Sequence, residues 1–314
     1  MTPRIDYGNG IHAIDATYVR HQLAAIHLII DNGRAAFVDC GSNYSLPAAQ
    51  AALSELGLTP DCVDYVLLTH IHLDHAGGAG AMMQAFPHAK LVVHPRGARH
   101  MIEPAKLWAA TEEVYGSERA KALYGALIPI AAERVLETTD GMMLTLGART
   151  LSFHDCPGHA KHHVFIHDHA ARGLFTGDTF GLSYRECDVD GRAFIFPTTT
   201  PSQFDPEAMR DSVARMLACQ PEAVYLTHYS RRAPPALLAT DLLRRLDGMV
   251  AIARQVGAGD TAIAAIHQHL RTYLLAEARA HGCQQSDVQL LEIWDMDLEL
   301  DAQGLAIWIA SQTR

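Results

Sequence analysis

The sequence lacks the features that mark secreted and membrane-spanning proteins. None of its apolar runs reaches the roughly 20 residues that a membrane-spanning helix needs. The first residues, MTPRIDYGNG, contain no apolar stretch of the kind found in a secretory signal. The six cysteines are scattered, and none belongs to a CxxC pair. We therefore expect a cytoplasmic protein whose thiols are reduced.

The sequence also lacks clustered charge of one sign. Its formal net charge is −10, and it carries neither a long Lys/Arg run nor an acidic tail. Binding to nucleic acid or to an anionic membrane needs a concentrated basic surface. We expect no nucleic acid and no membrane as partner, and a small molecule as substrate.

Hydrophobic residues make up 49% of the 314 residues, enough to bury a sizeable core. Short β-branched or alternating runs predict strands up to about residue 230, and helices are expected near 46–56, 77–86 and 205–217. Asp205 is the expected N-cap of the last of these, with Pro206 at the first helical position. The predicted strands are IHAIDATYV, LAAIHLIID, RAAFVD, VDYVLLT, KLVVH, MLTLG, RTLSFHD, HHVFIHD, GLFTGD and AVYLTH.

Two stretches read as helical instead. Residues from about 96 to 132 are rich in Ala, Leu and Glu, and form a helical insert between strands. Residues 231–314 form a helical C-terminal extension. We therefore predict a mixed α/β catalytic domain over residues 1–230, followed by that extension.

Histidine is abundant, with 19 residues, and it is concentrated in the stretch THIHLDHAGG (69–78). His70 and His72 are two residues apart at a strand end, so their side chains point the same way and can bind one ion. Asp74 and His75 follow where the chain turns toward a helix, and they could serve a second ion. Imidazole nitrogen and carboxylate oxygen suit zinc, iron or manganese.

More ligands are available at the ends of later strands. His159 follows RTLSFHD, Asp178 ends GLFTGD, and His228 ends AVYLTH. A single histidine after a strand is usually a surface residue. Three candidates in addition to HxHxDH favour a metal site.

These motifs resemble the metallo-β-lactamase-fold hydrolase superfamily, in particular its glyoxalase-II-like and lactonase-like branches, over about residues 11 to 230. The resemblance rests on THIHLDH (69–75), PGH (157–159), GD (177–178), TH (227–228) and the aspartate-bearing turn VDCG (38–41). It implies an αββα four-layer sandwich with the ligands on loops at one edge of the two sheets.

The resemblance also implies how the ligands divide between two divalent ions, most simply zinc, with iron or manganese as alternatives. The first ion takes His70, His72 and His159; the second takes Asp74, His75 and His228; Asp178 bridges the two. Asp74 and Asp178 are the expected catalytic carboxylates. The reaction implied is attack of a metal-bound hydroxide on an ester, thioester or lactone carbonyl.

Several residues outside this set have two possible roles. Asp39 is expected to orient a metal ligand. His162 and His163 depart from the family pattern, and we expect them to pack at a strand start. Tyr184, Tyr229 and Trp108 are candidates for substrate contact, and the insert that carries Trp108 is either a lid or part of the core.

We expect the following to be ordinary solvated charges rather than substrate contacts: Arg231, Arg232, Arg244 and Arg245. Trp294 and Trp308 are expected in the core or in a homodimer contact.

Other reactions stay open on the same residues. One is phosphodiester hydrolysis, and another is a mononuclear iron oxidation of the persulfide-dioxygenase type. The complete second ligand set speaks against a single ion. A metal-binding module without catalysis is the remaining alternative, and the full ligand set argues against it.

Overall fold

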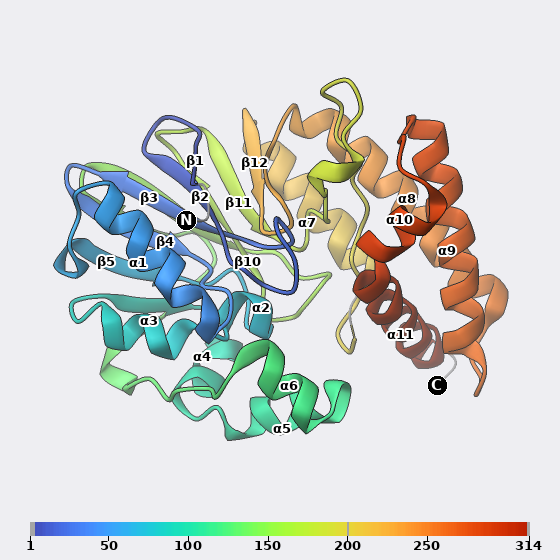
Figure 1. Cartoon of the computed structure of the whole chain (residues 1–314), viewed down its shortest axis with the longest axis horizontal. Coiled ribbons are helices and arrows are strands. Elements are labelled where there is room, and N and C mark those ends of the chain that lie inside the picture. The colour runs from blue at the N-terminus through green and yellow to red at the C-terminus, as the bar shows by residue number, and fades with distance from the viewer. Residues whose placement is uncertain (1–3, 200, 313–314) are drawn as a thin grey trace. The chain divides into compact units, whose positions relative to one another are not determined.

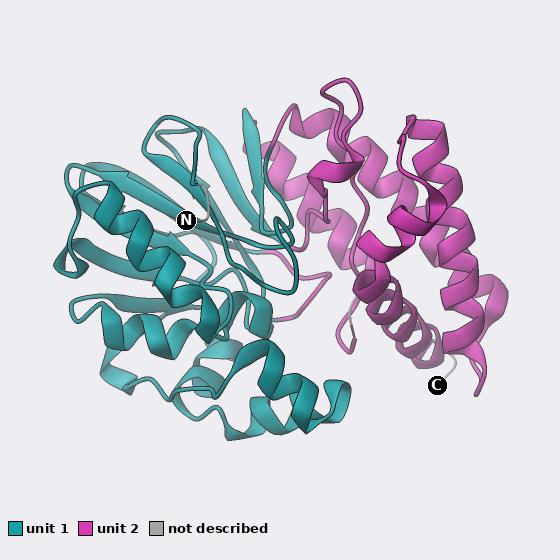
Figure 2. Cartoon of the chain, in the orientation of Figure 1, with its two compact units in different colours: residues 1–155, 162–177, 221–231 teal, residues 156–161, 178–220, 232–314 magenta. Residues whose placement is uncertain are grey.

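The computed structural model describes residues 4–199 and 201–312, in two compact units (Figure 2). Unit 1 comprises residues 1–155, 162–177 and 221–231, and unit 2 comprises residues 156–161, 178–220 and 232–314. Within the predicted domains 1–230 and 231–314, residues 1–3, 200 and 313–314 lie outside the described residues. The boundary near residue 230 stays a prediction.

Unit 1 is built on two mixed β-sheets. The first has the strand order β1-β2-β3-β4-β5-β6-β7, antiparallel from β1 to β4 and parallel from β4 to β7. Its strands are β1 Ile5–Asp6, β2 Ile11–Asp15, β3 Ala25–Asp31, β4 Arg34–Val38, β5 Val63–Leu67, β6 Lys90–Val93 and β7 Val135–Glu137.

The second sheet has the order β13-β12-β11-β10-β9-β8, in which β11 and β12 run parallel and β8 to β11 antiparallel. Its strands are β8 Met142–Leu146, β9 Arg149–Asp155, β10 Val164–Asp168, β11 Gly173–Gly177, β12 Ala223–Leu226 and β13 Ser230–Arg232. Side chains of both sheets share one buried core, with Ile29 and Leu67 from the first sheet and Phe153 and Phe175 from the second. The two sheets therefore face each other.

Helices of unit 1 contact the first sheet and form the predicted insert (Figure 1). Helix α1 contacts β2, α3 contacts β5 and β6, and α4 contacts β7. The helices of this unit are α1 Leu46–Glu55, α2 Leu73–Ala76, α3 Ala79–Ala85, α4 Pro95–Ile102, α5 Ala105–Tyr115 and α6 Ser117–Tyr124. The last three confirm that residues 96–132 are largely helical.

Unit 2 is mainly helical. Asp205 caps α7 by accepting from the backbone N–H groups of Glu207 and Ala208, both at 3.1 Å, as the sequence predicts. Helices α8, α9 and α11 pack on one another through apolar faces that include Leu246, Leu270 and Leu305. The helices are α7 Pro206–Ala218, α8 Pro235–Val256, α9 Ala262–His281, α10 Asp287–Ile293 and α11 Asp295–Ser311.

The predicted α/β class is confirmed, with two mixed sheets, flanking helices, a helical insert and a helical C-terminal extension. The strand predicted from residue 11 to 19 ends early, at Asp15, because the carboxylate of Asp15 accepts from Thr17 N and Gln22 N and turns the chain. Within the described residues, no helix combines the length and apolar character of a membrane span.

Candidate metal centre

The motif THIHLDHAGG begins at the end of β5 and continues into the short helix α2. The two glycines after His75 allow α2 to pack closely on the turn that follows Asp39. A Cβ on Gly78 would lie 2.5 Å from Ser42 O and 2.7 Å from Cys40 O, and Gly78 N donates to Gly41 O at 2.9 Å. Glycine is therefore required where the motif meets this turn.

Asp39 is the hydrogen-bonding centre of this part of unit 1. It is 1% exposed and has a positive φ of 57°, a strained conformation for a residue other than glycine. Its Oδ1 accepts from Thr69 N at 2.9 Å and from Thr69 Oγ1 at 3.0 Å. Its Oδ2 accepts from His75 Nδ1 at 2.8 Å and from Thr227 Oγ1 at 2.9 Å. The carboxylate thus joins the ends of β5 and β12 and fixes the ring of His75.

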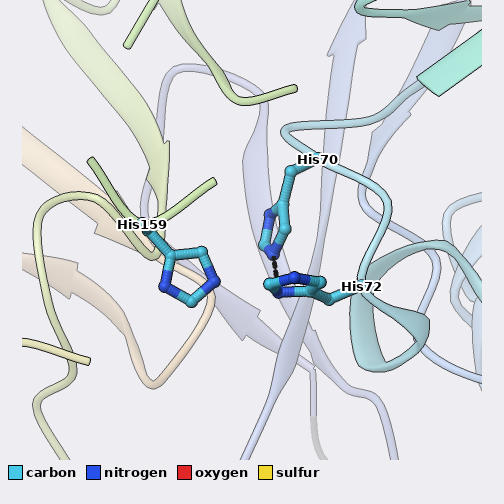
Figure 3. Close-up of side chains that lie close together, drawn as sticks. All are labelled: His70, His72 and His159. Carbon is cyan, nitrogen blue, oxygen red and sulfur yellow. Dashed lines mark hydrogen bonds between the residues drawn. The ribbon is translucent and has the colours of Figure 1, made fainter. Parts of the chain in front are cut away.

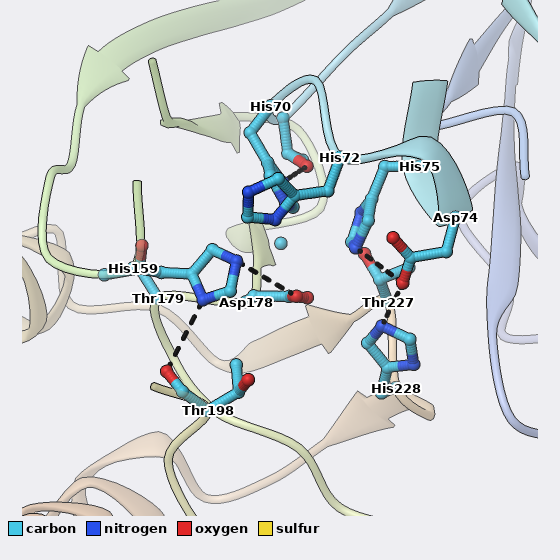
Figure 4. Close-up of polar contacts among 12 residues, drawn as sticks. His70, His72, Asp74, His75, His159, Asp178, Thr179, Thr198, Thr227 and His228 are labelled. Atoms are coloured by element: carbon cyan, nitrogen blue, oxygen red, sulfur yellow. Dashed lines mark hydrogen bonds and ion pairs between the residues drawn. The ribbon is translucent and has the colours of Figure 1, made fainter. Parts of the chain in front are cut away.

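Three predicted ligand atoms converge beside Asp39. His228 Nδ1 donates to Leu23 O at 2.8 Å, and His75 Nδ1 donates to Asp39, so both rings direct Nε2 away from these acceptors. The two Nε2 atoms lie 3.3 Å (His228) and 3.5 Å (His75) from one oxygen, Asp74 Oδ2 (Figure 4). Ligands at tetrahedral angles and 2.0–2.1 Å from a zinc ion are about 3.3 Å apart. Asp74, His75 and His228 therefore have the spacing of a metal site.

His70 and His72 form a second pair in unit 1. His70 Nε2 and His72 Nδ1 lie 3.0 Å apart, and Figure 3 shows the contact between the two rings. The hydroxyl of Thr69 donates to Asp39 and lies 3.2 Å from His70 Nδ1, so Asp39 also acts on His70 through Thr69. Fixing Nδ1 in this way directs Nε2 of His70 toward Nδ1 of His72, so that both nitrogens can face one ion.

His159 and Asp178 belong to unit 2. His159 Nδ1 donates to Thr198 O at 3.4 Å, and its Nε2 lies 3.6 Å from Asp178 Oδ2 (Figure 4). His159 is 1% exposed and Asp178 is 5% exposed. The structure thus brings together five predicted ligands in unit 1 and two in unit 2. Their grouping into one dinuclear centre stays a proposal.

His162 and His163 contact the predicted ligands His72 and His70. They therefore do more than pack at the start of a strand, the role expected from the sequence. The ring of His163 stacks on that of His70 with centroids 4.6 Å apart, and His162 lies edge-on to His72 at 5.6 Å. Burial, and secondly the imidazole of His72, lower the pKa of His162 to about 3, so its ring is neutral near pH 7. A Cβ on Gly177 would lie 2.6 Å from His163 Nε2, which explains the glycine before Asp178.

The tyrosine candidates are held by other contacts. The Tyr184 hydroxyl donates to Asp297 Oδ1 on α11 at 3.1 Å. Tyr229 is 1% exposed and packs with Ala13 and Ala25. On the insert, Trp108 is half-buried on α5, and the Tyr124 hydroxyl is hydrogen-bonded to that of Tyr18 at 2.8 Å. A substrate role for Tyr184, Tyr229 or Trp108 stays a prediction.

The expectation that the four arginines are solvated is wrong for two of them. Arg245 is 2% exposed, donates to Glu277 and to Ile195 O, and lies over the ring of Phe194. Arg232 is 4% exposed and donates to Asp188. Both can be interior residues because a planar guanidinium group donates to several acceptors at once. Those acceptors come from distant segments, so the local charge pattern does not reveal them.

The structure also identifies positioning groups that sequence reasoning missed. Thr69 and Thr227 both donate to Asp39, and each precedes a predicted histidine ligand. The repeated Thr-His pair at two strand ends was a signal for this role. The carbonyls of Leu23 and Thr198 carry no sequence signal, because any residue supplies a backbone oxygen.

A family model described as the metallo-beta-lactamase superfamily matches residues 23–228, more than half of the chain. A metallo-beta-lactamase fold-containing protein, ST1585 of Sulfurisphaera tokodaii, is 27% identical over 70% of this chain and 78% of its own length. Its solved structure, titled as the first of an archaeal member of the superfamily, has a TM-score of 0.67 and covers 95% of this chain and 98% of its own. At 23% identity that likeness shows the fold.

Two further relatives have names that include a substrate class. Acyl-coenzyme A thioesterase MBLAC2 of Gallus gallus is 29% identical over 54% of this chain and 63% of its own length. A hydroxyacylglutathione hydrolase of Stenotrophomonas maltophilia is 32% identical over 48% of this chain and 44% of its own length. The match spans less than two thirds of each. With its two facing sheets and its clustered histidines and aspartates, this chain belongs to the metallo-beta-lactamase superfamily.

Proposed function

We propose that the chain is a dinuclear metal-dependent hydrolase of acyl substrates, with thioesters as the first class to test. His70, His72 and His159 would hold one divalent ion, Asp74, His75 and His228 the other, and Asp178 would bridge them. Zinc is the first metal to test, with iron and manganese as alternatives. The observation that carries the proposal is the convergence of His75 Nε2 and His228 Nε2 on Asp74 Oδ2.

The donor set fits such ions on its own chemistry. His75, His228 and His159 each donate Nδ1–H to a fixed acceptor, which selects the tautomer with a lone pair on Nε2. A histidine ligand in a metal site is normally held by an acceptor in this way. In addition, the Nε2 of each of these three histidines faces a carboxylate, Asp74 or Asp178. Packing alone would not require this arrangement.

Divalent ions bound here would supply a nucleophilic water near neutral pH and stabilise negative charge on a carbonyl oxygen. The chain's own groups supply the remaining functions. Asp74 is the most accessible member of its group, with 21% of its side chain accessible, so it can pass a proton to solvent. Asp39 accepts hydrogen bonds from His75 and, through Thr69, acts on His70, so it holds two predicted ligands in fixed orientation.

The names of the relatives support acyl chemistry. Acyl-coenzyme A and hydroxyacylglutathione both carry an acyl group on a thiol, and each relative matches about half of this chain. We further propose that the substrate is a small molecule, without nucleic acid or membrane as partner, in the cytoplasm. A homodimer stays an open prediction.

The first test is elemental analysis of the protein purified without added metal. About two zinc or manganese ions per chain would support the dinuclear assignment. A panel of an acyl thioester, a p-nitrophenyl ester, a lactone and bis-p-nitrophenyl phosphate then identifies the reaction, and we expect the thioester to give the highest kcat/KM. Faster phosphodiester cleavage would favour the phosphodiesterase alternative. About one iron per chain, with oxygen uptake on a persulfide, would replace hydrolysis by oxidation.

Single substitutions test the ligand assignment. We expect His75→Ala and Asp178→Ala each to lower kcat/KM by about 100-fold or more and to lose bound metal, since even residues behind the ligands commonly contribute 10- to 100-fold. The matched control is His88→Ala, an exposed histidine that also faces an aspartate, Asp61. Near-native turnover in either ligand variant would contradict the two-ion assignment.

A further inference from the structure

Helix α11 carries a fully buried acidic residue, Asp301, on a mostly apolar face. Its side chain is 0% exposed, and Leu298, Ala302 and Leu305 beside it are buried hydrophobic residues. Burial raises the pKa of the Asp301 carboxyl well above its ordinary value, while hydrogen bonds from the Thr199 backbone act in the opposite direction. An acidic group in such a place is costly for folding unless its oxygens accept hydrogen bonds.

Thr199 is a hydrogen-bond partner of Asp301. Asp301 Oδ1 accepts from Thr199 N at 2.6 Å, and the Thr199 hydroxyl lies 3.2 Å from the same oxygen and 2.9 Å from Asp301 O. Thr199 is itself 0% exposed. The carboxyl and the backbone carbonyl of Asp301 therefore fix the N–H and the hydroxyl of Thr199.

The amide group that Asp301 holds is the one that contacts His159. The N–H of Thr199 and the carbonyl of Thr198 belong to one peptide unit, which is planar, so fixing the N–H also fixes the direction of the carbonyl. Thr198 O accepts from His159 Nδ1 at 3.4 Å. A continuous path thus runs from Asp301 through one peptide group to His159, entirely within unit 2.

We propose that Asp301 is a positioning residue for His159, which it acts on through the Thr198–Thr199 peptide group. This inference deepens the proposed function and rests on its assignment of His159 as a metal ligand. Histidine ligands are commonly oriented by a carboxylate or a backbone carbonyl; here the two act in series. The result is that Nδ1–H stays on the side of Thr198 and Nε2 faces Asp178, 3.6 Å away.

A positioning role differs in its consequences from a purely structural bond between α11 and the loop. Asp301→Asn keeps an oxygen that can accept from Thr199 N, whereas Asp301→Ala removes it. Leu305→Ala is the matched control, because Leu305 is also 0% exposed, lies one turn further along α11 and has no polar side-chain atom. If Asp301→Ala does not fold, Asp301→Leu fills the space without an acceptor.

The first measurement is zinc affinity of the full chain, by competition with a chromogenic chelator. We expect Asp301→Ala to weaken the binding of one zinc ion by about 10- to 100-fold, and Asp301→Asn to stay within about threefold of wild type. Leu305→Ala should lower the Tm without changing either affinity. Wild-type affinity in Asp301→Ala, equal losses in Asp301→Ala and Asp301→Asn, or an equal loss in Leu305→Ala would each overturn the proposal.

The second measurement is the tautomer of His159 in metal-free protein, from the ¹⁵N shifts of its ring nitrogens. We expect the Nδ1–H tautomer in wild type and Asp301→Asn, and a mixture in Asp301→Ala. An unchanged tautomer in Asp301→Ala would overturn the positioning role. If wild-type protein binds no zinc but the tautomer responds as expected, the proposed function fails and the positioning of His159 by Asp301 is supported.

Discussion

Replacing Asp39 tests whether one buried carboxylate organises the centre in unit 1. Two of its donors, Thr69 N–H and His75 Nδ1–H, have fixed directions, while the hydroxyls of Thr69 and Thr227 can rotate. In Asp39→Ala both fixed donors stay buried without an acceptor. Each such donor costs about 1–3 kcal/mol, so we expect the free energy of unfolding to fall by about 2–6 kcal/mol.

Asp39→Asn separates stability from metal binding. The amide oxygen can replace only one carboxylate oxygen, so either Thr69 N–H or His75 Nδ1–H faces an NH₂ group. We expect about half the loss of unfolding free energy seen in Asp39→Ala. Affinity for the ion proposed at Asp74, His75 and His228 should fall by about 10- to 100-fold, the usual effect of losing the group behind a histidine ligand.

The assays are urea unfolding of metal-free protein and chelator competition for zinc. The matched control is Asp31→Asn, because Asp31 also accepts from a backbone N–H, that of Ala148, but lies at the surface end of β3. That variant should change unfolding by less than about 1 kcal/mol and leave zinc affinity unchanged. Wild-type zinc affinity in Asp39→Asn would refute the reasoning, because it would show that His75 needs no acceptor at Asp39.

Two further predictions concern a glycine and a buried histidine. Gly158 has φ +135°, and an added Cβ would lie 2.4 Å from Met209 Cα. Gly158→Ala should therefore lower the free energy of unfolding by about 2–4 kcal/mol and weaken zinc binding through the adjacent His159. The control is Gly259→Ala, with φ +159° and open space, which should cost about 1 kcal/mol or less in the same thermal unfolding assay. Equal Tm losses in the two variants would contradict this. Burial lowers the pKa of His27 to about 4 from 6.5, so the unfolded chain takes up a proton first as the pH falls. Its contribution to stability is complete above pH 6.5 and is lost progressively down to about pH 4, a total of about 3 kcal/mol. In metal-free protein, His27→Gln should remove that part of the pH dependence, and His88→Ala should leave it; an unchanged profile in His27→Gln would show that His27 is not its source.

Short-range features of the fold were predictable from the sequence. Asp205 and Pro206 begin α7 as predicted, because an N-cap and a helix start depend on residues within a few positions. The β5 strand followed by HxHxDH was likewise predictable, since β-branched residues and turn residues are local signals. The strands β7 and β13 were missed because three residues show no period. They form through pairing at sheet edges, to which the sequence gives no local guide.

The sequence by itself determined which side chains can bind metal, because the ligand chemistry of imidazole and carboxylate groups depends on residue type alone. The tertiary structure decided which nitrogen of each histidine faces its neighbours. That choice depends on acceptors far away in the sequence: Leu23 O for His228, Asp39 for His75 and Thr198 O for His159. It also decided that Arg245 is interior and that Asp301 acts on the loop beside His159. Such contacts follow from the packing of distant segments, and no local pattern specifies them.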